Sequence, residues 1–218
     1  MSSLRKIKLS IIAHKVGPVS TRSPPRNAAP GFRQDTLDAQ ILATHSFSNA
    51  PPLDILLVPG GIGNRVLERD NDTAIEAFIA SRYDELKYLL SVCTGASQLA
   101  TSGVLEGRRA TSNKRAWNWV ITHGHNVSWV PTARWTQDGK IWTSSGVAAG
   151  WSILSSDFLF FESLSTNLTH CTGMDMTYAF LKHVFGEEQP GTIMNSMEYT
   201  PHTDPDWDPF SIVWNVSI

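Results

Sequence analysis

Two short apolar runs, each followed at once by a glycine turn, constrain the fold of this chain most strongly. The first is ILLV at 55–58, which leads into PGG, and the second is YLLSV at 88–92, which leads into CTGA. Runs that are largely apolar throughout, rather than at alternate positions, are typical of strands buried on both faces in a parallel sheet. We therefore predict two central parallel strands whose ends open onto the same edge of the sheet.

Helical patterns alternate with these and other predicted strands. Apolar spacing, small residues and glycine stops predict helices over 72–79, 94–102, 114–123 and 175–185. Further strands are predicted over 8–13, 41–47 and 108–111, and 129–132 is predicted to pair with 141–144 around the Asp138-Gly139 turn. The Pro-rich stretch 17–30 and the tail from 199 are predicted to be irregular.

This order of elements indicates one α/β domain over residues 1–218. A chain of 218 residues that is 41% hydrophobic is long enough to bury one sizeable core. Because strands alternate with helices, we expect a three-layer sandwich with a mainly parallel central sheet.

The charge pattern narrows the class of binding partner. A formal net charge of -2 and the absence of a Lys/Arg-rich run leave no basic footprint for nucleic acid or for an anionic membrane. No window reaches the length of a membrane span, and the basic start MSSLRKIKLS lacks an apolar signal core. We therefore expect a cytoplasmic protein that acts on a small, uncharged or weakly polar molecule.

The metal-ligating and thiol residues are few or scattered. Cys93 and Cys171 lie in different contexts and without C-x-x-C spacing, so we expect neither a disulfide framework nor a metal site. The seven histidines lack ligand spacing, and Trp117 and Trp119 are expected to pack in the core. No cofactor is indicated.

Cys93 is the candidate for chemistry because it lies between a strand and a predicted helix. The positive end of a helix dipole and unpaired amides are expected to lower the pKa of its thiol. Amides of Thr94 and of Gly60 or Gly61 could stabilise negative charge on a bound substrate, as in an oxyanion hole. The alternative is that Cys93 is a small buried hydrophobic residue at the end of a strand.

The segments VPGG, SVCTGA, GVLEGRRAT and SSGVAAG occur in the order and spacing of the ThiJ/PfpI (class I glutamine-amidotransferase-like) superfamily, which the chain resembles. The resemblance covers most of residues 41–150 and resumes at GMDMTYAFL. It implies a flavodoxin-like fold and a homodimer. It also implies that Cys93 is the nucleophile and Thr94 its neighbour in the oxyanion site.

The elbow SVCTGA, with threonine after the cysteine, resembles the isocyanide hydratase branch. That resemblance implies a hydro-lyase that adds water to an isocyanide to give an N-substituted formamide, in secondary metabolism or detoxification. Protease-like members carry a histidine soon after the position of Ala110-Thr111, where this chain reads SNK, so proteolysis is not expected. The alternatives are a non-enzymatic or redox-sensing protein, or a glyoxalase-like thiol enzyme.

Two departures from the hydratase pattern bear on activity. The hydratases carry an L-D-x-x-G-P segment after their first strand, whereas the opening KLSIIA of this chain resembles the second strand of the family. We therefore expect the first strand of the family and its aspartate to be missing, and Asp35 and Asp38 lie in the wrong context to replace it. Residues 151–172 form an insertion, which is either a surface excursion or translated intron sequence.

Overall fold

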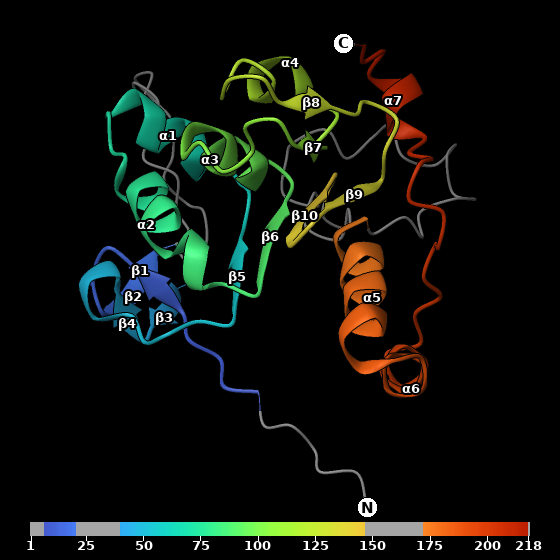
Figure 1. Cartoon of the computed structure of the whole chain (residues 1–218), viewed down its shortest axis with the longest axis horizontal. Helices are drawn as coiled ribbons and strands as arrows, with labels where there is room; N and C mark the ends of the chain where they lie inside the picture. The colour runs from blue at the N-terminus through green and yellow to red at the C-terminus, as the bar shows by residue number, and fades with distance from the viewer. Residues whose placement is uncertain (1–6, 21–39, 147–171, 218) are drawn as a thin grey trace, which may run out of the picture.

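A mixed four-stranded sheet lies at the centre of the molecule (Figure 1). The structure is a computed structural model that describes residues 7–20, 40–146 and 172–217. The strands follow the order β5 (Ile55–Val58), β6 (Tyr88–Val92), β10 (Ile141–Ser144) and β9 (Trp135–Asp138). β6 runs parallel to both of its neighbours, whereas β9 and β10 form an antiparallel hairpin.

The two faces of the sheet bury different clusters. Leu89 of β6 is paired in register with Ile141 of β10, and both side chains belong to one hydrophobic cluster. The next pair, Leu90 and Trp142, belongs to a second cluster. Since successive side chains of a strand point to opposite faces, the sheet is buried on both sides, as its largely apolar sequence predicted.

Helices cover each face of the sheet (Figure 1). One side carries α1 (Gly63–Arg69), α2 (Ala74–Arg82) and α3 (Gly95–Thr101). The other side carries α5 (Thr172–Phe185) and α6 (Glu188–Ser196). These three layers confirm the predicted α/β, flavodoxin-like fold.

The remaining elements are short. Three two-stranded sheets flank the core: β1 (Ile12–Ala13) with β4 (His45–Ser46), β2 (Gly17–Ser20) with β3 (Gln40–Ala43), and β7 (Arg109–Ala110) with β8 (Ser128–Trp129). The short helices are α4 (Trp117–Val120), α7 (Phe210–Val213) and the 3-10 turns η1 (Phe47–Asn49) and η2 (Tyr83–Glu85).

Several local predictions were wrong, and at two of them strand pairing overrode the local pattern. Residues 17–20, predicted as loop, form β2 because β3 supplies an antiparallel partner. β10 pairs with 135–138 rather than with 129–132, since the turn at Gly139, with φ +59°, joins β9 directly to β10. Of the helix predicted over 114–123, only α4 is helical. The tail from 199, predicted to be irregular, contains the short helix α7, whose main-chain groups are held against the core through Asp208.

The run ILLV forms a parallel strand as predicted, but β5 is an edge strand among the described residues rather than a central one. Ile55 is 40% exposed and Leu57 is 48% exposed as a result. Of the insertion at 151–172, only Thr172 lies within the described residues, where it begins α5; Asp35, Asp38 and Cys171 lie outside them.

Candidate active site

Cys93 occupies a strained turn between β6 and α3. Its φ is +59°, in the left-handed region that residues with a side chain rarely adopt. The start of α3 lies very close to the end of β5. A Cβ on Gly95 would be 2.3 Å from the Val58 carbonyl oxygen, so this approach requires glycine. Such strain persists only where the surroundings hold it, and it is common at functional sites.

Hydrogen bonds on both sides hold the main chain of Cys93. Its N–H donates to the Ser144 carbonyl of β10 across 3.1 Å. The Ser112 hydroxyl, which lies just after β7, donates to the Cys93 carbonyl across 2.8 Å. Two strand ends therefore fix the turn that presents the thiol.

The half-buried thiol of Cys93 has a pKa above its ordinary value. Burial is the largest cause, and it outweighs the hydrogen bonds from the main chain and hydroxyl of Thr94 and from the Asn113 side chain, which favour the thiolate. The predicted lowering of this pKa was therefore wrong, because α3 is short and desolvation dominates. No charged group of the described residues contributes to the shift.

The glycine turn after β5 lies against the cysteine turn. A Cβ on Gly60 would lie 2.7 Å from the Cys93 Cβ and 2.5 Å from the Thr94 nitrogen, so only glycine fits there. The Gly61 N–H donates to the Thr94 hydroxyl oxygen across 2.8 Å. The four residues predicted for the site thus meet, but the Gly61 amide is already used within the protein.

Two residues near the thiol were missed by the sequence analysis. Asn64, in the first turn of α1, donates its amide to the Thr94 hydroxyl oxygen across 3.3 Å. Asn113 lies in the segment that follows β7, and its side chain acts to lower the pKa of the Cys93 thiol. The sequence signal for Asn113 was its position in SNK after Ala110-Thr111, whereas nothing local marked Asn64.

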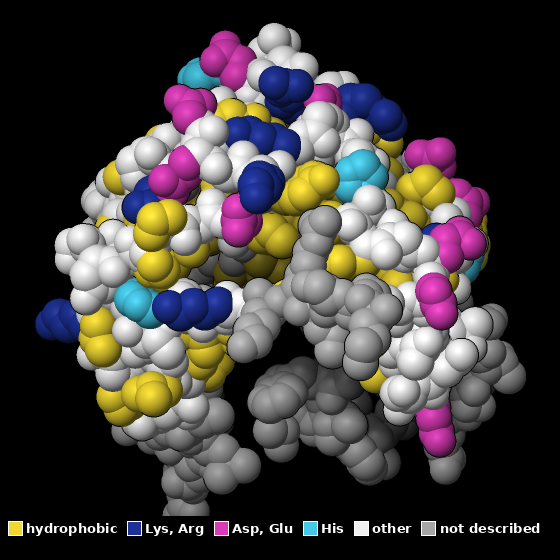
Figure 2. All heavy atoms as spheres, turned by 60° about the horizontal axis from the view of Figure 1, so that its bottom comes forward, with side chains coloured by type: hydrophobic (Ala, Val, Ile, Leu, Met, Phe, Trp, Pro, Cys, Tyr) yellow, Lys and Arg dark blue, Asp and Glu magenta, His cyan; other side chains and the backbone are white. Residues whose placement is uncertain are grey.

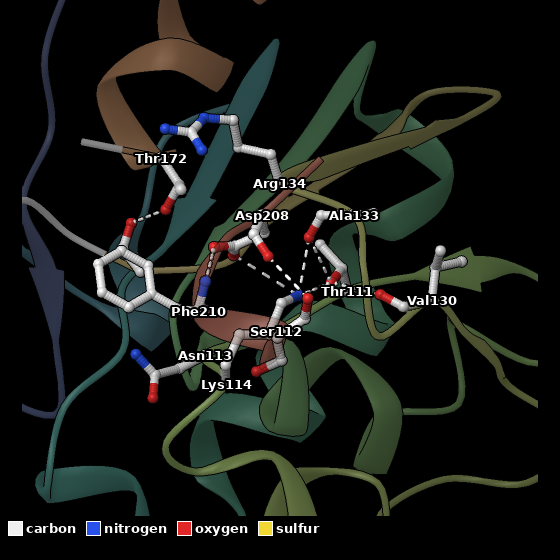
Figure 3. Close-up of polar contacts among 12 residues, drawn as sticks. Thr111, Ser112, Asn113, Lys114, Val130, Ala133, Arg134, Thr172, Asp208 and Phe210 are labelled. Carbon is white, nitrogen blue, oxygen red and sulfur yellow. Dashed lines mark hydrogen bonds and ion pairs between the residues drawn. The ribbon is translucent and has the colours of Figure 1, made fainter. Parts of the chain in front are cut away.

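A buried polar cluster adjoins Asn113 (Figure 3). Lys114 Nζ donates to the Thr111 hydroxyl and to the Ala133 carbonyl, each across 2.7 Å. It also lies 3.8 Å from a carboxylate oxygen of Asp208, which comes from the tail predicted to carry no chemistry. Sequence reasoning had no local signal for this contact, because 208 is distant from 114 in the chain.

Other classes of site find little support in the described part of the chain. No group of three or more His, Cys, Asp or Glu side chains there could hold a metal ion. No described helix is long and apolar enough to span a membrane. Figure 2 shows Lys and Arg side chains interspersed with Asp and Glu on the face that it displays. Trp117, by contrast, packs in the core as expected.

The profile of the DJ-1/PfpI family matches residues 13–155 of the chain. An isonitrile hydratase of Pseudomonas putida is 36% identical over 112 residues, which are 51% of this chain and 46% of that protein. The chain thus spans about half the length of this curated relative.

Solved structures show the same fold. A ThiJ/PfpI family protein from Pseudomonas syringae superposes with a TM-score of 0.62 at 21% identity, over 89% of this chain and 64% of that one. A cysteine-to-alanine mutant of a DJ-1 superfamily protein from Salmonella typhimurium superposes with a TM-score of 0.53 at 18% identity, over 75% of each chain. At these identities the likeness concerns the fold alone.

Proposed function

Since the chain belongs to the DJ-1/PfpI family, we propose that it is a cysteine-dependent hydratase that converts an isocyanide and water into an N-substituted formamide. The observation that carries this proposal is the strained turn that holds Cys93 beside Thr94 at the end of β6. The similarity to an isonitrile hydratase supports the choice of substrate class.

The raised pKa of the Cys93 thiol suits the first step of this reaction. Because the thiol keeps its proton near neutral pH, it can supply both the sulfur and the proton that bond to the isocyanide carbon. The sulfur bonds to the terminal carbon, the thiol proton moves to the same carbon, and R–N=CH–S–Cys results. No separate carboxylic acid is required for this addition.

Hydrolysis of the thioimidate then completes the reaction. Water adds to the carbon, one of its protons moves to the nitrogen, and the carbon–sulfur bond breaks to release R–NH–CHO. The departing sulfur takes the second proton and regenerates the thiol. Hydrogen bonds from Thr94 and Asn113 stabilise the negative charge on the leaving sulfur.

The oxyanion role of the glycine turn is part of the proposal. A Cβ on Gly60 would lie 2.5 Å from the Thr94 nitrogen and 2.7 Å from the Cys93 Cβ, whereas the Gly61 N–H acts through the Thr94 hydroxyl that it holds. Gly61 is therefore proposed to position Thr94, and the direct donors are proposed to be Thr94 and Gly60.

The test is formation of formamide from an aryl isocyanide by the purified chain. The Cys93→Ala variant is run beside the wild type, and Cys171→Ala serves as the matched control because it removes the other cysteine. We expect turnover by wild type and Cys171→Ala and none by Cys93→Ala. Equal turnover by Cys93→Ala would remove the thiol from the mechanism.

The same samples separate the alternatives. Methylglyoxal is assayed in parallel, since a glyoxalase-like enzyme would consume it and leave the isocyanide. Mass spectrometry after peroxide treatment tests redox sensing, which the raised thiol pKa disfavours because oxidation proceeds through the thiolate. Consumption of methylglyoxal alone would replace the hydratase proposal with the glyoxalase one.

We also propose that two copies of the chain associate. Exposed Ile55 and Leu57 lie on a strand with an open side among the described residues, and such an edge favours pairing with another strand. Light scattering on the wild type and on Leu57→Lys measures the molecular mass of each in solution. A monomeric wild type would contradict the proposed association.

A further inference from the structure

Lys114 is a charged side chain in an almost fully buried position. Its side chain is 1% exposed, and its Nζ lies 4.9 Å from the centre of the Trp117 ring. Two of its N–H groups are used by the Thr111 hydroxyl and the Ala133 carbonyl, and the Asp208 carboxylate faces it at 3.8 Å (Figure 3). A lysine buried in this way is costly unless it has a structural or functional task.

Asp208 connects this lysine to the C-terminal part of the chain. Its side chain is fully buried, and its Oδ1 accepts a hydrogen bond from the Phe210 N–H at the start of α7 across 3.0 Å. Its Oδ2, the atom that faces Lys114, has no hydrogen-bond partner among the described residues. The Asp208 N–H also donates to the Thr132 carbonyl across 2.8 Å, so the aspartate itself is firmly held.

The segment that ends at Lys114 is also the one that contacts the thiol. Ser112 donates to the Cys93 carbonyl, and the Asn113 side chain acts to lower the pKa of the Cys93 thiol. A shift of this segment would therefore change both contacts at once. Lys114 Nζ holds the segment through Thr111 and joins it to Asp208.

The protonation of Lys114 is finely balanced. Burial lowers the pKa of Lys114 to about 8, and the negative charge of Asp208 acts in the opposite direction. Asp208 is the charged group of the described residues that influences it. A neutral amine still has N–H groups for Thr111 and Ala133, but it loses the ionic attraction to Asp208.

We propose that Lys114 is a positioning residue for Cys93, because its ammonium group joins the Thr111–Asn113 segment to Asp208 and so keeps Asn113 against the thiol. This inference deepens the proposed function, since it concerns the same cysteine. It is tested with iodoacetamide, a reagent that reports on the thiol without any turnover of an isocyanide.

The experiment compares wild type with Lys114→Met, Asp208→Asn and Lys140→Met. Lys140 is the matched control, because its Nζ also donates two hydrogen bonds, to the Tyr83 and Leu86 carbonyls, but belongs to the β9–β10 turn. The rate of Cys93 alkylation is measured from about pH 6.5 to about pH 9.5, a range that brackets the titration of Lys114. Near-UV circular dichroism of each sample shows that the fold is kept.

We expect wild type to react about threefold faster than Lys114→Met near neutral pH, because a hydrogen bond to the thiolate favours its formation. The ratio of the wild-type alkylation rate to the Lys114→Met rate should fall toward one as the pH rises through about 8, where Lys114 loses its charge. Asp208→Asn should react as slowly as Lys114→Met already near neutral pH, since the carboxylate that attracts the lysine ammonium is gone. Lys140→Met should match wild type throughout.

A role in folding alone would give a ratio that does not change with pH, and that result would overturn the proposal. If Lys114→Met does not fold, the comparison of wild type with Asp208→Asn decides the question: the wild-type rate should be the higher one near neutral pH and approach that of Asp208→Asn as the pH rises through about 8. Loss of isocyanide turnover together with a pH-dependent ratio would sink the hydratase proposal but leave this one standing.

Discussion

The N–H of Gly61 donates a hydrogen bond to the hydroxyl oxygen of Thr94 across 2.8 Å. This bond joins the glycine turn after β5 to the cysteine turn after β6. The hydroxyl oxygen also accepts the Asn64 amide, so Thr94 is the residue through which α1 and both turns are connected. The geometry around Cys93 consequently depends on contacts that extend beyond the thiol itself.

Replacing Thr94 with valine should disturb both stability and reactivity. Thr94→Val keeps the shape but leaves the N–H of Gly61 and the amide of Asn64 without their acceptor. We expect the free energy of unfolding to fall by about 1–3 kcal/mol, the cost of a buried donor left unsatisfied. Cys93 alkylation should also slow, because the Thr94 hydroxyl favours the thiolate.

Urea unfolding measures the stability of this variant. Thr94→Ser is the control, since it keeps the hydroxyl and should stay close to wild type. A valine variant as stable and as reactive as the serine variant would show that the hydroxyl is dispensable.

Adding one methyl group at Gly60 should be harmful. In Gly60→Ala the new Cβ would lie 2.5 Å from the Thr94 nitrogen and 2.7 Å from the Cys93 Cβ, so the two turns must move apart. We expect a loss of about 1–3 kcal/mol in the free energy of unfolding, as for overpacked interiors, together with reduced turnover.

Gly63→Ala is the matched control for Gly60→Ala. A Cβ on Gly63 meets nothing within 4 Å, and Gly63 begins α1, where alanine favours the helix. Thermal unfolding of the two variants should therefore change in opposite directions. A Gly60→Ala protein with wild-type melting behaviour would contradict the close approach.

A buried ion pair on the other face of the sheet should matter for stability. Arg134 Nε donates to Asp175 Oδ2 across 2.9 Å, and both side chains are fully buried. Removing one charge leaves the other uncompensated, so Arg134→Met should lower the free energy of unfolding by about 3–5 kcal/mol.

The double variant Arg134→Met/Asp175→Leu should lose less than the sum of the single variants, since it removes both buried charges. Arg69→Met is the control, because the pair of Arg69 with Asp70 is exposed and should contribute little. Urea denaturation measures the free energy of unfolding of the wild type and of each variant. Additive losses in the double variant would show that the two side chains do not act as a pair.

The depressed pKa of Lys114 predicts how stability changes with pH. Between about 8, its pKa in the folded protein, and 10.5, its ordinary value, the unfolded chain binds more protons than the folded one. Stability due to this residue therefore rises with pH in that window, by at most about 1.4 kcal/mol per pH unit.

The difference in unfolding free energy between wild type and Lys114→Met contains this effect, because only wild type carries the lysine. The difference should shift in favour of wild type as the pH increases from about 8 to about 10. A difference that stays constant over this range would mean that the lysine titrates alike in both states.

Local pattern was sufficient for the elements that carry the thiol. The strand predicted at 88–92 is β6, and α5 contains the helix predicted at 175–185. Gly103, with φ +83°, follows the helix that it was predicted to end. These features depend on neighbours in the chain, through strand burial, helical spacing and the freedom of glycine.

The sequence by itself determined that Cys93 follows a buried strand at a turn before a helix, and that glycines flank it, because these properties arise from residues adjacent in the chain. Only the tertiary structure decided the environment of the thiol. Its pKa is raised by burial, and Asn64 and Asp208 reach the site from distant segments. Burial and contact between distant residues depend on how the layers pack, which periodicity along the chain does not encode.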